Sequence, residues 1–241
     1  GKQALERLMA RLASLHAHQA FGKFEAGIPA ILAHRREGGT LSILESAIGG
    51  IDGQQQSLIS TVNEQARALQ RAASAMAQIH ALTATKTRID QSWCDRWITQ
   101  PAHMFGNASA VLLSARARGA AIDRFVAEQT GFWMHQNVLL GCGHRDYSLG
   151  NIVFGEETAG HGLGFRVAGI IDWEASVDDA PACIDICHLA ITSTALLRAE
   201  ELGHQVRRLL DEPRMILESC EWLKNVPHFN DFPGDRVNNS R

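Results

Sequence analysis

Residues 144–151 read His-Arg-Asp-Tyr-Ser-Leu-Gly-Asn, and residues 169–174 read Gly-Ile-Ile-Asp-Trp-Glu. The two stretches place Asp146, Asn151 and Asp172 in or beside turns that flank short apolar runs. A β-hairpin there would hold their side-chain oxygens close together on rigid supports. Two carboxylates and a carboxamide are hard oxygen ligands that suit Mg²⁺, which usually binds carboxylates together with substrate phosphates. Asp146 is also suited to orient a hydroxyl group and accept its proton.

Each aspartate alone is typical of an ordinary turn or strand end. The three polar residues together favour a site, because gathered titratable groups are a feature of active sites. An alternative is a serine hydrolase, because the residues around Ser148 match the G-x-S-x-G motif of that class except for its first glycine. Asp146 stands where that motif needs its first glycine, and no alternating strand–helix pattern surrounds it, so we set the hydrolase aside.

The composition limits the kind of protein. The chain has 241 residues, 45% of them hydrophobic, which is enough for a substantial core. The formal net charge is −3, and no long basic run is present, so we expect neither nucleic acid nor a membrane surface as partner. No apolar stretch reaches the roughly 18 residues of a membrane span. The oligomeric state is left open.

The cysteines indicate free thiols. Their number, 5, is odd and their spacing is scattered, which favours a reducing cytoplasm over a disulfide framework. Cys183, Cys187 and His188 have a zinc-like spacing. No second close pair of ligands accompanies them, so apolar thiols on a helix face are the better interpretation.

The expected elements are mainly helical. Apolar spacing predicts helices over residues 2–18, 54–82, 107–130, 181–198 and 200–223. Short apolar or β-branched runs predict strands over residues 30–33, 41–44, 137–141, 152–154 and 165–171. The helix over 54–82 contains neither glycine nor proline, and Val62, Leu69, Ala73 and Met76 fall near one face. This order is that of a mainly helical α+β protein.

The motifs resemble those of the aminoglycoside phosphotransferase and choline kinase family, which has a protein-kinase-like fold. The catalytic loop of that family reads H-G-D-x-x-x-x-N, as residues 144–151 do except at Arg145. A later strand of the family ends in I-D-W or I-D-F, matched by residues 171–173. The family's Asp-Leu-Ala helix start is similar to residues 185–190, which read Asp-Ile-Cys-His-Leu-Ala.

The resemblance implies a function and a division of the chain. Residues 1–48 would be a remnant of the N-terminal β lobe, and residues 49–241 a helical C-terminal lobe with a small catalytic β-hairpin. The reaction would move the γ-phosphoryl group of ATP (or GTP), with Mg²⁺, to a hydroxyl of a small molecule. Aminoglycosides, choline or ethanolamine, and sugars are the acceptors that the family suggests.

The resemblance also implies roles for single residues. Asp146 would be the catalytic base. Asn151 and Asp172 would hold Mg²⁺. His144 would brace the catalytic loop, and Asp185 would stabilise it by hydrogen bonding from below.

Further expectations concern the nucleotide. The backbone near Glu45, Ser46 and Ala47 would face the adenine as the hinge between lobes. Arg145, in place of the usual glycine, either pairs with a carboxylate or phosphate or is a solvated side chain. Nothing before residue 28 reads as a glycine-rich phosphate loop followed by a lysine strand, so we expect the first strands of this lobe to be missing by truncation, disorder or a true loss. The alternative function is a catalytically inactive kinase-like lobe that acts as a binding or regulatory module.

Overall fold

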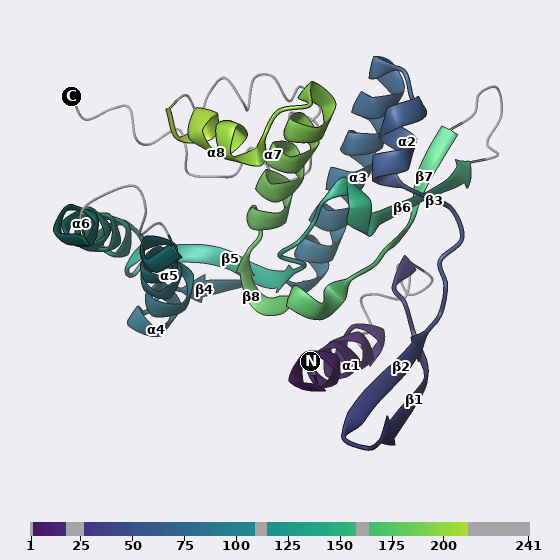
Figure 1. Ribbon diagram of the computed structural model, residues 1–241, viewed down its shortest axis with the longest axis horizontal. Coiled ribbons are helices and arrows are strands. Elements are labelled where there is room, and N and C mark those ends of the chain that lie inside the picture. The colour runs from purple at the N-terminus through teal and green to yellow at the C-terminus, as the bar shows by residue number, and fades with distance from the viewer. Residues whose placement is uncertain (1, 18–26, 109–114, 158–163, 212–241) are drawn as a thin grey trace. The chain divides into compact units, whose positions relative to one another are not determined.

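The computed structural model describes residues 2–17, 27–108, 115–157 and 164–211 (Figure 1). It mixes helices with short antiparallel strands, which confirms the α+β class. The chain divides into two compact units, of which the first contains residues 1–84 and 141–241 and the second residues 85–140. The lobe boundary expected at residue 48 stays a prediction.

The first unit carries the motifs. Its helices are α1 (Lys2–Ala17), α2 (Gly53–Ile59), α3 (Val62–Thr83), α7 (Ile184–Arg198) and α8 (Leu202–Asp211). Its strands are β1 (Ile31–Glu37), β2 (Thr40–Glu45), β3 (Ile51–Asp52), β6 (Ile152–Glu157), β7 (Gly164–Ile170) and β8 (Val177–Pro181). Strands β3, β6 and β7 form one antiparallel sheet in that order, with Ile152 opposite Ile170. This pairing brings the two motif-bearing chain segments side by side. Part of the helix expected over 200–223 lies outside the described residues.

Strands β1 and β2 form a hairpin that is longer than the sequence predicted. Gly38 and Gly39 both have positive φ, 54° and 81°, as a two-residue hairpin turn requires. The turn therefore occupies only these glycines, and residues 35–37, expected to be loop, continue the strand to the pairing of Glu37 with Thr40.

The single helix expected over 54–82 is two helices. Helix α2 ends before Ser60, and α3 begins after Thr61, whose hydroxyl accepts from the backbone N–H of Glu64. The Glu64 carboxylate accepts in return from the backbone N–H of Thr61 at 2.8 Å. This capping box satisfies the free amides of a helix start, so it ends one helix and begins another without glycine or proline.

The core of the first unit lies around α3. Its buried face packs against α7 and β7, and the face predicted from Leu69, Ala73 and Met76 is buried. Val62 is 80% exposed, contrary to expectation, because it is the first residue of α3 instead of an interior one. Phe154, which follows the motif at residues 144–151, and Trp173, which follows Asp172, are buried in the same core.

The second unit has a core of its own. It contains β4 (Thr85–Arg88), α4 (Gln91–Cys94), a π-helical turn (Asp95–Thr99), α5 (Gln100–Ala108), α6 (Ala115–Trp133) and most of β5 (Asn137–Gly143). The expected start of a helix at Asn107 is wrong, because Asn107 lies within α5. Trp93 is buried and stacks on Trp97 with ring centroids 6.1 Å apart, so this pair belongs to the core of the second unit.

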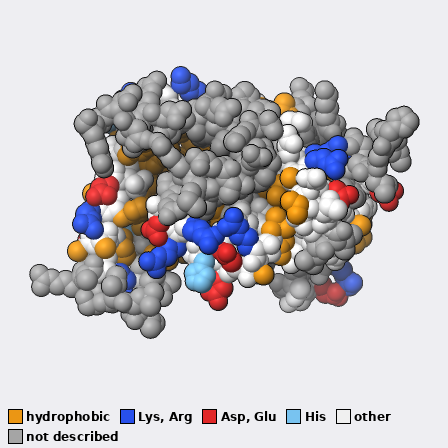
Figure 2. All heavy atoms as spheres, turned by 90° about the horizontal axis from the view of Figure 1, so that it is seen from above, with side chains coloured by type: hydrophobic (Ala, Val, Ile, Leu, Met, Phe, Trp, Pro, Cys, Tyr) orange, Lys and Arg blue, Asp and Glu red, His pale blue; other side chains and the backbone are white. Residues whose placement is uncertain are grey.

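The face drawn in Figure 2 mixes both signs of charge. Basic and acidic side chains of the described residues lie close together there, and hydrophobic side chains lie beside them. Such a surface follows from 23 basic and 26 acidic residues in the whole chain. Among the helices that the structure describes, none has the length and hydropathy needed to cross a membrane.

Candidate active site

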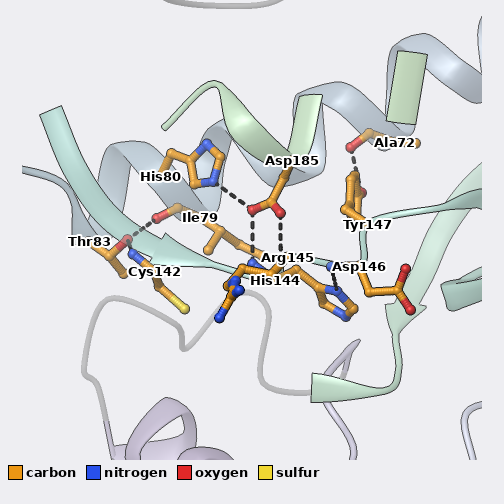
Figure 3. A network of polar contacts seen from close by, with 10 residues as sticks. All are labelled: Ala72, Ile79, His80, Thr83, Cys142, His144, Arg145, Asp146, Tyr147 and Asp185. Atoms are coloured by element: carbon orange, nitrogen blue, oxygen red, sulfur yellow. Dashed lines mark hydrogen bonds and ion pairs between the residues drawn. The ribbon is translucent and has the colours of Figure 1, made fainter. Parts of the chain in front are cut away.

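The catalytic loop is fixed from inside the first unit by Asp185 of α7 (Figure 3). Its carboxylate accepts from the backbone N–H of His144 at 2.9 Å and of Arg145 at 2.7 Å, and from His80 Nε2 at 3.2 Å. Burial alone would raise the pKa of Asp185, but the hydrogen bonds and the charge of His80 outweigh it, so the pKa lies below the ordinary value. Asp185 is therefore held as a carboxylate with no exposed surface.

His144 joins the catalytic loop to the end of β7. Its Nε2 donates to the carbonyl of Ile171 at 2.8 Å, and its Nδ1 accepts from the backbone N–H of Asp146 at 3.3 Å. One nitrogen donates and the other accepts, which defines a neutral imidazole. Burial lowers the pKa of His144 and keeps it in this form. The ring also packs edge-on against Trp173, with centroids 4.8 Å apart.

The exposed side of the loop presents Asp146. The carboxamide nitrogen of Asn151 donates to the carbonyl of Asp146 at 2.8 Å and to its Oδ2 at 3.1 Å. The side chain of Asp146 is 52% exposed. Asn151 thus fixes one carboxylate oxygen with its nitrogen, and its own side-chain oxygen is not used in these two bonds. Its backbone carbonyl accepts from Ile171 at 2.9 Å, which ties the pair to the Asp172 segment.

Asp172 follows β7 in a left-handed conformation, with φ 65°. Such strain is tolerated by aspartate better than by most residues and is common at functional sites. The neighbouring Trp173 is anchored by its indole N–H, which donates to the carbonyl of Ile170 at 2.8 Å. Burial raises the pKa of Glu45, and the negative charge of Asp172 raises it further, so these two acidic groups share one region.

Residues 2–217 match the sequence profile of the phosphotransferase enzyme family. The chain belongs to this family. No curated protein sequence matches it significantly.

Solved structures with a similar fold include other phosphotransferases. Aminoglycoside phosphotransferase APH(3'')-Id from Streptomyces rimosus, in complex with ADP and streptomycin, is 20% identical with a TM-score of 0.52, and the match covers 80% of this chain and 68% of that one. A structure of the same enzyme without named ligands gives 0.54, also at 20% identity, over 91% and 75% of the two chains. The gentamicin–APH(2'')-IIa complex, 13% identical, gives 0.52 over 92% and 70%. These likenesses establish the protein-kinase-like fold of this phosphotransferase.

The expected nucleotide hinge of this phosphotransferase is only partly free. The backbone N–H of Ser46 donates to the carbonyl of Ala30 at 2.8 Å, and its hydroxyl accepts from the Ala30 N–H at 2.8 Å. Ser46 therefore helps to close the strand pair, in which Glu45 also pairs with Ile31. That Glu45, Ser46 and Ala47 face a nucleotide stays a prediction. The Oε1 of Glu45 is buried and has no hydrogen-bond partner among the described residues.

The donor set suits a magnesium nucleotide. Asn151 and Asp172 offer hard oxygen atoms, and Mg²⁺ commonly takes one or two protein oxygens and completes its shell with phosphates and water. Within the described ranges no three His, Cys, Asp or Glu side chains gather as a metal cage. A cation here would therefore depend on phosphate oxygens of the nucleotide for the rest of its ligands.

His188 is a neighbour of Asp146 that the sequence did not reveal. Its Nε2 lies 4.0 Å from Oδ1 of Asp146, and its Nδ1 is buried without a partner among the described residues. In the sequence, His188 appeared in the zinc-like spacing that was set aside and within the Asp-Ile-Cys-His-Leu-Ala stretch, with no role in the site. It lies about one helical turn after Asp185 on α7, and the packing of α7 places it beside a loop 42 positions earlier in the chain. No local sequence pattern records that contact.

Proposed function

We propose that this phosphotransferase moves the γ-phosphoryl group of ATP or GTP to a hydroxyl of a small molecule. The observation that carries the proposal is the half-exposed carboxylate of Asp146, oriented by Asn151 on a loop that Asp185 holds from inside. A rigid support beneath an exposed reactive group is what positioning catalysis needs. The acceptor is aminoglycoside-, choline- or sugar-like, since the relatives of similar fold include streptomycin- and gentamicin-bound enzymes.

In this mechanism, Asp146 accepts a hydrogen bond from the acceptor hydroxyl and then its proton. The hydroxyl oxygen forms a bond to the γ-phosphorus while the bond to the β–γ bridging oxygen breaks, which releases the nucleoside diphosphate. Asn151 keeps one oxygen of Asp146 in place, so the other is available to the hydroxyl. Asn151 and Asp172 would hold Mg²⁺, which when bound neutralises charge on the phosphates.

The test is release of nucleoside diphosphate by the full chain, with Mg²⁺ and ATP or GTP, across amino sugars, choline and neutral sugars. Replacement Asp146→Asn should lower the turnover number by about 10²- to 10⁴-fold, the contribution of general base catalysis. Asp123→Asn changes an exposed aspartate of α6 and serves as the matched control. Turnover that survives Asp146→Asn unchanged would contradict the mechanism. Nucleotide binding without turnover on any acceptor would favour the second function, a non-catalytic binding module.

A further inference from the structure

A cavity of about 510 Å³ lies between α1 and the chain segment that follows Asp172, beside Arg145. Its walls are Arg7 and Arg11 of α1, Arg145 of the loop, and the chain segment 174–178. This volume is in the range of small-molecule sites. The residues proposed for phosphoryl transfer, Asp146, Asn151 and Asp172, do not line it, although Arg145 and Glu174 lie within two positions of them. The cavity therefore adjoins that site without including its reactive groups.

Arg145 holds an unfavourable backbone conformation at this cavity. Its φ is 67°, a left-handed value that glycine adopts readily and residues with a β-carbon do not. The hydrogen bond from its N–H to Asp185 Oδ1 fixes that conformation. Figure 3 shows the side chains of Arg145 and Asp146 leaving the loop in different directions. A strained position that carries a long basic side chain indicates that the side chain has a use.

The cavity already contains an anion that belongs to the chain. Asp178 forms an ion pair with Arg11, whose second guanidinium nitrogen donates to the carbonyl of Ser176 at 3.4 Å. The side chain of Arg11 is only 16% exposed, whereas that of Asp178 is 74% exposed. A carboxylate so open to water is held loosely, so a stronger external anion can take its place on a guanidinium that is already buried and oriented.

We propose that this cavity binds the phosphate group of a small phosphate monoester, with Arg7, Arg11 and Arg145 as its cationic ligands. Guanidinium groups bind phosphate by paired N–H donors, and a tetrahedral dianion accepts from several of them at once, which one carboxylate does not. Glu174 also lines the cavity, and its carboxylate is an acceptor for hydroxyl groups on the rest of the ligand. The site goes beyond phosphoryl transfer and does not depend on it.

The test is calorimetric titration of the nucleotide-free full chain with inorganic phosphate and, separately, glycerol 3-phosphate. Both should bind saturably, and Arg7→Ala and Arg145→Gly should each weaken binding about tenfold, the loss of a charged hydrogen-bond partner. Arg145→Gly also removes the backbone strain, so loss of fold does not explain its effect. Asp178→Asn should strengthen binding, because it removes the internal competitor. Arg35→Ala, an exposed arginine of β1, should have no effect.

Three results would overturn the proposal. One is the absence of saturable binding of either probe to the unaltered chain. Another is binding that Arg7→Ala and Arg145→Gly leave unchanged. The last is displacement of the probe by ADP with Mg²⁺, which would assign it to the nucleotide site.

Tighter binding of glycerol 3-phosphate than of inorganic phosphate would support the monoester as the ligand. Equal binding would overturn that part of the proposal and leave free phosphate as the ligand. Because no turnover is measured, failure of the proposed function does not affect these outcomes.

Discussion

The two sides of the catalytic loop differ in exposure and in the number of bonds they make. On the inner side, His80, His144 and Asp185 are buried and joined by charge-assisted hydrogen bonds. On the outer side, Asp146 is half exposed and its side chain is held mainly by Asn151. The groups that hold the loop are thus different from the group proposed to react with substrate, so the two can be disturbed separately by mutation.

Removal of the inner carboxylate should have the largest effect on stability. Asp185→Ala leaves His80 and two backbone N–H groups buried without their acceptor, and the free energy of unfolding should fall by about 3–5 kcal/mol. Urea unfolding measures this change. The exposed Asp123→Ala should stay within about 0.5 kcal/mol of the unaltered chain. A loss below about 1 kcal/mol for Asp185→Ala would mean that the inner side is not the support described above.

Acid should weaken the inner side through His144. Burial lowers its pKa in the folded chain from the ordinary 6.5, so the unfolded chain binds the proton more readily. The contribution of this lowered pKa to the stability of the folded chain is fully present above about pH 6.5. It is lost as the pH falls through the folded pKa of His144. The lowered pKa of Asp185 acts in the same direction, but only below its ordinary value of 3.8.

The pH prediction is checked by urea unfolding at a series of values from about pH 8 to about pH 5. His144→Gln removes the titrating ring, so its unfolding free energy should fall less steeply with acid than that of the unaltered chain. Parallel pH dependences for the two proteins would show that His144 contributes nothing to this loss.

The capping box of Thr61 and Glu64 lies on the surface, so its loss should change the free energy of unfolding less than loss of the buried Asp185 bonds. Thr61→Ala removes the cap of α3, including the hydroxyl that accepts from Glu64, and should lower the free energy of unfolding by about 1 kcal/mol. Asn63→Ala changes an exposed neighbour in the same turn and leaves the cap in place. Equal losses for the two variants would show that the cap does not stabilise this helix boundary.

The sequence predicted the parts of the site that are local. Residues 144–151 and 169–174 carry their polar groups within short motifs, and hairpin pairing of the intervening strands brings them together, as β6 and β7 do. The fold class followed from the same motifs and from the helical spacing. The α2–α3 break was missed because no glycine or proline marks it, although Thr61 and Glu64 have the spacing of a capping box.

The rest depends on contacts that no local pattern records. His188 reaches Asp146 because of how α7 is placed, and Glu45 reaches the Asp172 region because of where β2 ends. Arg145 was left between an ion-pairing and a solvated side chain by the sequence. Its positive φ and its place in a cavity with Arg7 depend on tertiary packing.

The bond from Arg145 to Asp185 spans 40 positions of the chain. During synthesis the catalytic loop leaves the ribosome before its support exists, and at 5–20 residues per second the wait for Asp185 lasts about 2–8 s. Through that interval Asp185 cannot accept from the amides of His144 and Arg145, so the bonds that fix the loop in the folded chain are absent. The nascent phosphotransferase thus completes its catalytic loop only after α7 has begun to emerge, which separates the order of translation from the order of assembly.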